Sequence, residues 1–156
     1  MELDFKPNVG LVSSTRRFVA ELFSSMLVDP DATSRLALTV HELLENIVKY
    51  STDGNGKLEV GLEDAPSGHV LRIQASNRTT PERVNDLRRR ISDLSELTDP
   101  METYVRMMRE SVARGDGSEL GLARIRVEGE MALGFSADGD HVTITARTPV
   151  ALVEAP

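Results

Sequence analysis

The sequence predicts an α+β fold: a two-layer α/β sandwich in which helices cover a mixed, mostly antiparallel sheet. Stretches with apolar residues at helical spacing come in groups, and runs with apolar residues at every second position come in pairs. The expected order is strand, two helices, two strands, three helices, two strands, which is typical of helices grouped against one antiparallel sheet. Neither G-x-G-x-x-G nor a Walker sequence occurs, so a doubly wound nucleotide-binding fold is not expected.

The first half of the chain is expected to hold an extended N-terminus, two helices and a hairpin. Asp29 followed by Pro30 is a typical helix start, because Asp caps free amides and Pro lacks an N–H that would be unpaired there. This helix ends at a turn-rich segment, 51–56. The expected elements are an extended segment 1–9, helices 10–27 and 30–50, and strands 57–63 and 69–75.

The second half is expected to hold three helices and a second hairpin. Thr80-Pro81 and Asp99-Pro100 repeat the pattern of a capping residue followed by proline, so each should open a helix. The glycine-rich segment 115–118 interrupts the helices, and Asp138-Gly139-Asp140 is a typical hairpin turn. The expected elements are helices 81–95, 99–113 and 119–131, and strands 132–137 and 141–148.

Composition narrows the class of protein. A chain of 156 residues with 40% hydrophobic residues is long enough for one domain, expected to span 1–156, with its own core. The formal net charge of −7 disfavours binding to nucleic acid. The sequence has no apolar run long enough for a membrane span, and its acidic N-terminus is unlike a signal peptide. The absence of cysteine excludes disulfides and thiolate metal sites and fits a cytoplasmic protein.

The helix 30–50 carries the candidate site. An apolar stripe of Leu36, Val40, Leu43 and Ile47 should face the core. Three polar residues, Glu42, Asn46 and Lys49, are spaced by four and three positions and therefore share another face. A carboxylate can orient a nucleophile, an amide oxygen can bind magnesium, and an ammonium can neutralise phosphate. The alternative is an amphipathic helix whose polar face is simply solvated.

The segment 41–50, HELLENIVKY, resembles the N-box of the GHKL ATPases, whose ATP-binding domain is the Bergerat fold. The resemblance implies that Asn46 binds Mg²⁺ and that Glu42 acts as a general base. It also implies that Lys49 contributes to phosphate binding. Ile47 stands where this family usually has alanine.

Two further segments correspond to the glycine-rich boxes of the same family. Segment 117–125, GSELGLARI, resembles the G2 box, and Glu119 stands where the family has its middle glycine. Glycines there let backbone amides approach phosphate. The resemblance implies nucleotide contacts from Gly117, Leu120, Gly121 and Leu122. The alternative is a loop followed by a core helix.

The family's D-x-G-x-G box, which reads adenine, is absent from the segment that follows the strand 69–75. The chain has Ser76-Asn77-Arg78-Thr79-Thr80 there. Asn77 could still meet the adenine edge, because an amide both donates and accepts hydrogen bonds. The alternative is that Asn77 only caps or turns the chain.

Within the GHKL group the chain looks most similar to small anti-sigma factors and partner-switching serine kinases, which lack a histidine phosphoacceptor domain. The resemblance implies ATP and Mg²⁺ as cofactors, an ATP lid at about 96–118, and a possible homodimer. It also implies a protein partner, either a STAS-domain antagonist, a sigma factor or a response regulator. A degenerate GHKL domain that binds no nucleotide and acts only as a protein-interaction module is the alternative. An unrelated α/β structural domain is a third possibility.

Overall fold

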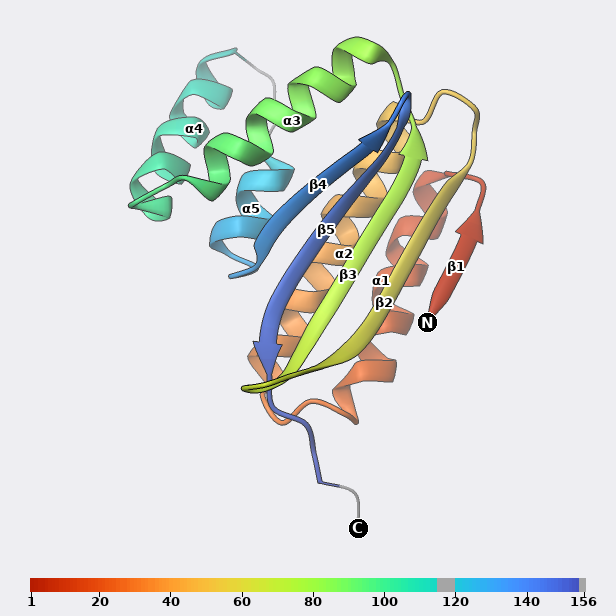
Figure 1. Cartoon of the computed structure of the whole chain (residues 1–156), viewed down its shortest axis with the longest axis vertical. Helices are drawn as coiled ribbons and strands as arrows, with labels where there is room; N and C mark the ends of the chain where they lie inside the picture. The colour runs from red at the N-terminus through yellow and green to blue at the C-terminus, as the bar shows by residue number, and fades with distance from the viewer. Residues whose placement is uncertain (115–119, 155–156) are drawn as a thin grey trace.

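The computed structural model describes residues 1–114 and 120–154. Five strands form a single sheet in the order β1-β2-β3-β5-β4, and each neighbouring pair is antiparallel (Figure 1). This confirms the expected sandwich. The strands are β1 (Glu2–Phe5), β2 (Gly56–Ala65), β3 (Gly68–Arg78), β4 (Ala132–Asp138) and β5 (His141–Val150). The helices are α1 (Val9–Ser24), α2 (Pro30–Tyr50), α3 (Pro81–Ser95), α4 (Pro100–Arg114) and α5 (Gly121–Val127).

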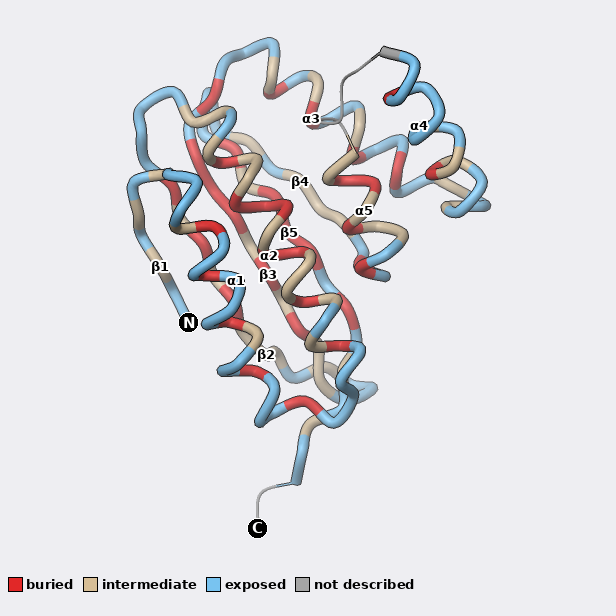
Figure 2. Tube along the Cα trace, turned by 180° about the vertical axis from the view of Figure 1, so that it is seen from behind, coloured by how far each residue is buried: buried red, intermediate tan, exposed pale blue. Residues whose placement is uncertain are grey.

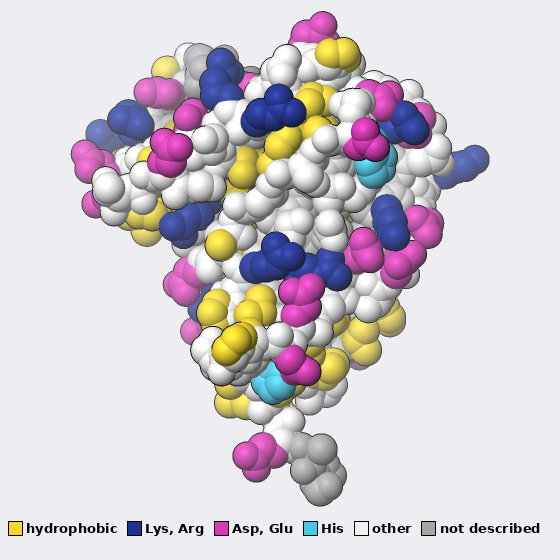
Figure 3. Space-filling view, in the orientation of Figure 1, with side chains coloured by type: hydrophobic (Ala, Val, Ile, Leu, Met, Phe, Trp, Pro, Cys, Tyr) yellow, Lys and Arg dark blue, Asp and Glu magenta, His cyan; other side chains and the backbone are white. Residues whose placement is uncertain are grey.

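The helices gather on one side of the sheet. Helices α1 and α2 run along its back in Figure 1, α5 lies beside α2, α3 packs on the edge strand β4, and α4 lies outermost against α5 (Figures 1 and 2). The opposite face of the sheet has no helix over it in the described part of the chain (Figure 1), and charged side chains of both signs are spread over this side of the molecule (Figure 3). It carries polar rows such as Glu59, Gln74 and Thr145, which the strand register places side by side. A helix layer and a bare polar face explain why the strands alternate apolar and polar residues.

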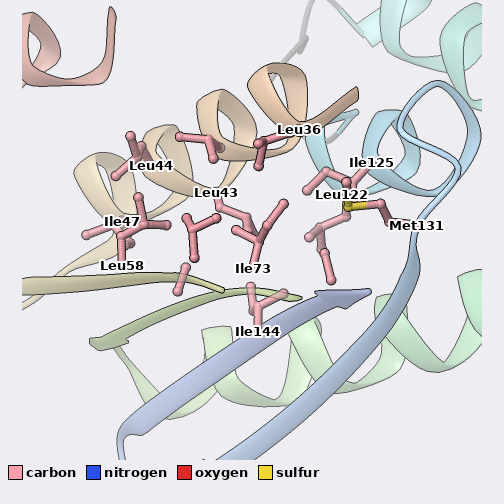
Figure 4. Packing of buried hydrophobic residues seen from close by; sticks show 14 of the residues in the cluster. Leu36, Leu43, Leu44, Ile47, Leu58, Ile73, Leu122, Ile125, Met131 and Ile144 are labelled. Carbon is pink, nitrogen blue, oxygen red and sulfur yellow. The ribbon is translucent and has the colours of Figure 1, made fainter. Parts of the chain in front are cut away.

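Helix α2 forms the centre of the core. Asp29 Oδ1 accepts a hydrogen bond from the Asp31 amide at 2.9 Å, so the predicted cap is confirmed. Leu43 is fully buried and points from α2 toward Ile73 of the sheet (Figure 4). The fully buried side chains with the largest volumes come from α1, α2, α5, the sheet and the turn before β4: Val19, Leu36, Val40, Leu43, Leu44, Ile47, Leu58, Val60, Leu71, Ile73, Ile125 and Met131.

Helix α5 is shorter than the predicted helix 119–131. It ends at Val127 because the next residues cannot continue it. A side chain on Gly129 would collide with the Ile125 carbonyl oxygen, and Glu130 has a left-handed φ of 51°. The hairpin turn between β2 and β3 is likewise tighter than predicted, because the strands extend to Ala65 and restart at Gly68.

None of the helices in the described part of the chain combines the length and hydrophobicity needed to cross a bilayer.

Gly56 allows a close contact between β2 and α2, which gives a direct test of the packing. A methyl group there would collide with Ile47 Cγ2 and lie 3.1 Å from Phe5 Cζ. We expect Gly56→Ala to lower the free energy of unfolding by about 1–3 kcal/mol. Gly61→Ala is the matched control, because the same strand has open space at Gly61. Urea unfolding of both variants checks this, and equal stabilities would contradict the packing.

Candidate functional site

The three polar residues of α2 lie at different depths. Glu42 is buried, with 7% of its surface exposed, whereas Asn46 is half-buried and Lys49 is exposed. The three residues follow one another along the same side of α2, as predicted, but they differ in how far they are buried. Helix α5 packs on α2, with its first residue against Glu42.

Glu42 packs directly on the first residue of α5. A Cβ on Gly121 would lie 2.7 Å from Glu42 Oε2, closer than side-chain carbons ever approach an oxygen. Only glycine fits at this position with the carboxylate as placed. The fold thus joins the segment that resembles the N-box to the segment that resembles the G2 box.

The charge on Glu42 is balanced between burial and one cation. Burial raises the pKa of Glu42 above its usual value, and the guanidinium of Arg124 opposes that rise. Arg124 Nη1 donates a hydrogen bond to Glu42 Oε1. One carboxylate oxygen therefore packs against Gly121, and the other accepts the hydrogen bond from Arg124.

Asn46 carries a polar atom without a partner. Its Nδ2 is buried and has no hydrogen-bond partner within the described residues. Nδ2 is therefore a donor available to an acceptor that approaches this side of α2. The described residues contain no cluster of three or more His, Cys, Asp or Glu side chains able to hold a metal ion. A magnesium ion at Asn46 would therefore take most of its ligands from phosphate and water.

Lys49 points to a different neighbour than the spacing suggested. Its Nζ lies 3.4 Å from Glu45 Oε2, one turn back on the same helix. His41 Nε2 lies 3.5 Å from the other oxygen of Glu45. Glu45 thus bridges two basic side chains along the solvent side of α2.

Asn77 lies at the end of β3, beside the end of α2. It is buried, and its Nδ2 donates to the Arg78 carbonyl oxygen at 2.9 Å. The Arg78 carbonyl also accepts from the Thr52 amide at 3.0 Å, which ties the two ends together. The side-chain amide of Asn77 thus makes a local hydrogen bond to the next residue of β3. It also lines a cavity of about 630 Å³ at this end of the sheet, with Lys57 and His141.

Some of the predicted residues of the G2-like segment lie outside the described residues, and others pack at or near the core. Gly117 lies outside the described residues, as does Glu119. Leu120 is half-buried at the start of α5, and Leu122 packs in the hydrophobic core (Figure 4). The side chain of Leu122 is thus where the core-helix alternative placed it.

The structure adds functional candidates that the sequence reasoning missed. Arg124 joins Glu42 to Glu128, and the hydroxyl of Tyr104 donates to Glu128 Oε1. The spacing of Arg124 and Glu128 by four residues indicates a helical ion pair. No sequence pattern links that pair to Glu42 on another helix, or to Tyr104 on a third.

Glu42 and Arg124 open onto a groove on the helix side of the molecule. This cavity of about 380 Å³ lies between α1, α2 and α5. Its lining residues are Arg16, Ser34, Ala37, Leu38, His41, Glu42 and Arg124. A buried carboxylate that borders an open, mainly basic groove can exchange a proton with a group that binds there.

No protein-family model and no curated protein sequence matches this chain. Among solved structures, it is similar to a chain of the crystal structure of the SiaB–SiaC complex from Pseudomonas aeruginosa. The TM-score is 0.66 at 15% sequence identity, and the match covers 98% of this chain and 89% of that chain. The similarity establishes that the two chains share a fold over nearly their whole length.

A double-mutant cycle tests the contact between Gly121 and Glu42. Gly121→Ala alone should destabilise by about 1–3 kcal/mol, although alanine is the better helix former. In a Glu42→Ala background the methyl group has room, so we expect a coupling of about 1 kcal/mol or more. Chemical denaturation of the four proteins measures it, and additive effects would refute the contact.

The pH dependence of stability tests the environment of Glu42. A carboxyl with a raised pKa in the folded chain binds its proton more tightly there. Its stabilising contribution is therefore complete below the usual value of 4.5 and is lost as the pH rises through the folded value. We expect wild type to lose stability relative to Glu42→Gln as the pH rises from about 4.5 toward neutrality. Unfolding midpoints across this range check the expectation, and a difference that does not change with pH would contradict it.

Proposed function

We propose that this chain is a cytoplasmic regulatory protein of the GHKL group that binds ATP·Mg²⁺ and phosphorylates, or at least sequesters, a protein partner. The packing of Glu42 on Gly121 carries the proposal, because it brings together the two segments that resemble the N-box and the G2 box. In this proposal the chain is of the anti-sigma and serine-kinase type.

The residues around Asn46 fit a magnesium–nucleotide. Its buried Nδ2, which has no partner among the described residues, would donate to a phosphate oxygen, and its Oδ1 would bind the metal. Bound magnesium supplies charge neutralisation to the transferred phosphoryl group. The close approach of Gly121 to Glu42 brings the backbone of the G2-like segment beside the N-box-like segment, where its amides would contact phosphate.

Glu42 fits the role of a general base. Its carboxylate borders the groove between α1, α2 and α5, where a partner's hydroxyl can approach. In the proposed reaction, the serine oxygen attacks the terminal phosphorus while its proton passes to Glu42, and the bond to the leaving phosphate oxygen breaks. Arg124 favours the ionised form of Glu42, which accepts the proton, because its positive charge opposes the effect of burial.

Three other residues keep their roles as proposals. Lys49 would have to leave Glu45 to reach phosphate, and a long lysine side chain at an exposed position can do so. The Oδ1 of Asn77 would accept from the adenine edge, while its Nδ2 donates to the Arg78 carbonyl oxygen. Gly117 and Leu120 would add backbone contacts to phosphate.

The partner in this proposal is a STAS-domain antagonist, a sigma factor or a response regulator. The fold match is to a chain of a two-protein complex, which supports a role in protein recognition. The basic side chains Arg16, His41 and Arg124 around the groove favour a segment with acidic residues beside its hydroxyl.

A degenerate domain that binds partners without nucleotide is the second candidate. Arg83 supports it, because its guanidinium stacks 3.6 Å from the centre of the Tyr50 ring at the end of α2. This contact joins the end of α2 to the first turn of α3. The carboxylate at Glu119 in the G2-like segment also disfavours phosphate.

Calorimetric titration of ATP with and without Mg²⁺ separates the two candidates. We expect magnesium-dependent binding to wild type and its loss in Asn46→Ala, because the metal loses its only proposed protein ligand. Asn85→Ala is the matched control, since it removes the same amide from an exposed position on α3 and should bind as wild type does. No binding to wild type at roughly 1 mM ATP would leave the nucleotide-free module as the function.

A further inference from the structure

A continuous line of polar contacts crosses from α4 to α2. The Tyr104 hydroxyl donates to Glu128 Oε1. Glu128 lies 3.4 Å from Arg124 Nε through Oε1 and 3.5 Å from Arg124 Nη2 through Oε2. Arg124 then donates from Nη1 to Glu42 Oε1. Four side chains on three helical segments are thus linked, and the proposed function uses only the last contact.

Each contact has a defined donor and acceptor: the Tyr104 hydroxyl and the Arg124 guanidinium donate, and the carboxylates of Glu128 and Glu42 accept. Burial, followed by the nearby Glu128 carboxylate, raises the pKa of Tyr104 to about 12, so its hydroxyl keeps its proton at neutral pH. The hydrogen bond from Tyr104 in turn lowers the pKa of Glu128. Glu128 is therefore a carboxylate that accepts from Tyr104 and from Arg124 at the same time.

Glu128 determines where the guanidinium of Arg124 lies. The two nitrogens directed at Glu128 leave Nη1 as the one that reaches Glu42. A planar guanidinium held at one edge can present its other edge in only one direction. The position of Glu128 therefore sets the contact between Arg124 and Glu42.

Few buried side chains hold α4 in its place. Within the described side chains of α4, only Tyr104 and Ser111 are buried, while Met101, Met108 and Val112 are exposed. The helix lies at the outside of the molecule (Figure 1). Elements with little buried surface are those that undock at the lowest free-energy cost. Tyr104 is thus both a main anchor of α4 and the first member of the line of contacts.

We propose that Tyr104, Glu128 and Arg124 are positioning residues through which the docking of α4 on α5 controls the proposed base, Glu42. With α4 docked, Glu128 is partly satisfied by Tyr104, and Arg124 is shared with Glu42. When α4 leaves, Glu128 loses its hydroxyl donor and competes more strongly for Arg124. Glu42 then loses its closest cation, and burial favours its neutral form.

The other charged groups near Glu42 do not provide this link. His41, Glu45 and Lys49 act on Glu42 from its own helix, and Arg16 of α1 lines the same groove. Their described contacts do not involve α4. The inference rests on the proposed function only in taking Glu42 as the reactive group, because the contacts exist whether or not nucleotide binds.

The test is an NMR titration of the glutamate carboxyl carbons, with the Glu42 signal identified by its absence in Glu42→Gln. Arg124→Gln should raise the pKa of Glu42 by about 1–3 units, the usual effect of removing an adjacent opposite charge. Tyr104→Phe should raise it in the same direction by a part of that amount. Tyr50→Phe is the matched control, since it removes the same hydroxyl from the other tyrosine of the chain, and should leave Glu42 unchanged.

The double variant distinguishes coupling from general loosening of the structure. If Tyr104 acts through Arg124, Tyr104→Phe should have no further effect on Glu42 once Arg124→Gln is present. An unchanged Glu42 titration in Tyr104→Phe, or an equal shift in Tyr50→Phe, would overturn the inference. These measurements need neither nucleotide nor partner, so their failure is separate from a failure to bind ATP.

Discussion

The rotation of α2 about its own axis decides what the rest of the molecule can do. Leu36, Leu43 and Ile47 are fully buried against the sheet and fix that rotation. Glu42, one residue before Leu43, is thereby turned to the boundary with α5 rather than to solvent. Because a helix turns by about 100° per residue, no other rotation would bury the same apolar stripe. The packing of the hydrophobic core thus buries a carboxyl group, whose negative charge then needs a nearby positive charge.

That compensation comes from a small number of neighbours. Arg124 supplies the charge and Gly121 supplies the room. Without such partners, burial would favour the protonated form of the carboxyl group. The same contacts link Glu42 to α5 and, through Glu128 and Tyr104, to α4.

Sequence patterns predicted the order and type of the elements well, because the caps at Asp29 and Thr80 and the apolar periodicities are local properties. The depth of Glu42 and Lys49 was not predictable from spacing. These residues lie nearly on one line along α2, but Glu42 packs against the first residue of α5, whereas Lys49 is exposed. The contacts of Arg124 and Tyr104 were also inaccessible, because each joins residues on different helices whose packing no local pattern encodes.

The position of β5 has a consequence for how the chain reaches its native state. The last strand in sequence, His141–Val150, lies between β3 and β4, inside the sheet rather than at its edge. Until this segment is available, β3 presents an unpaired edge of ten or so residues that can pair with another chain. During synthesis the β2–β3 hairpin lacks its second neighbour until β5 has been made, and such non-local pairing slows folding. An unpaired strand edge favours aggregation during that interval.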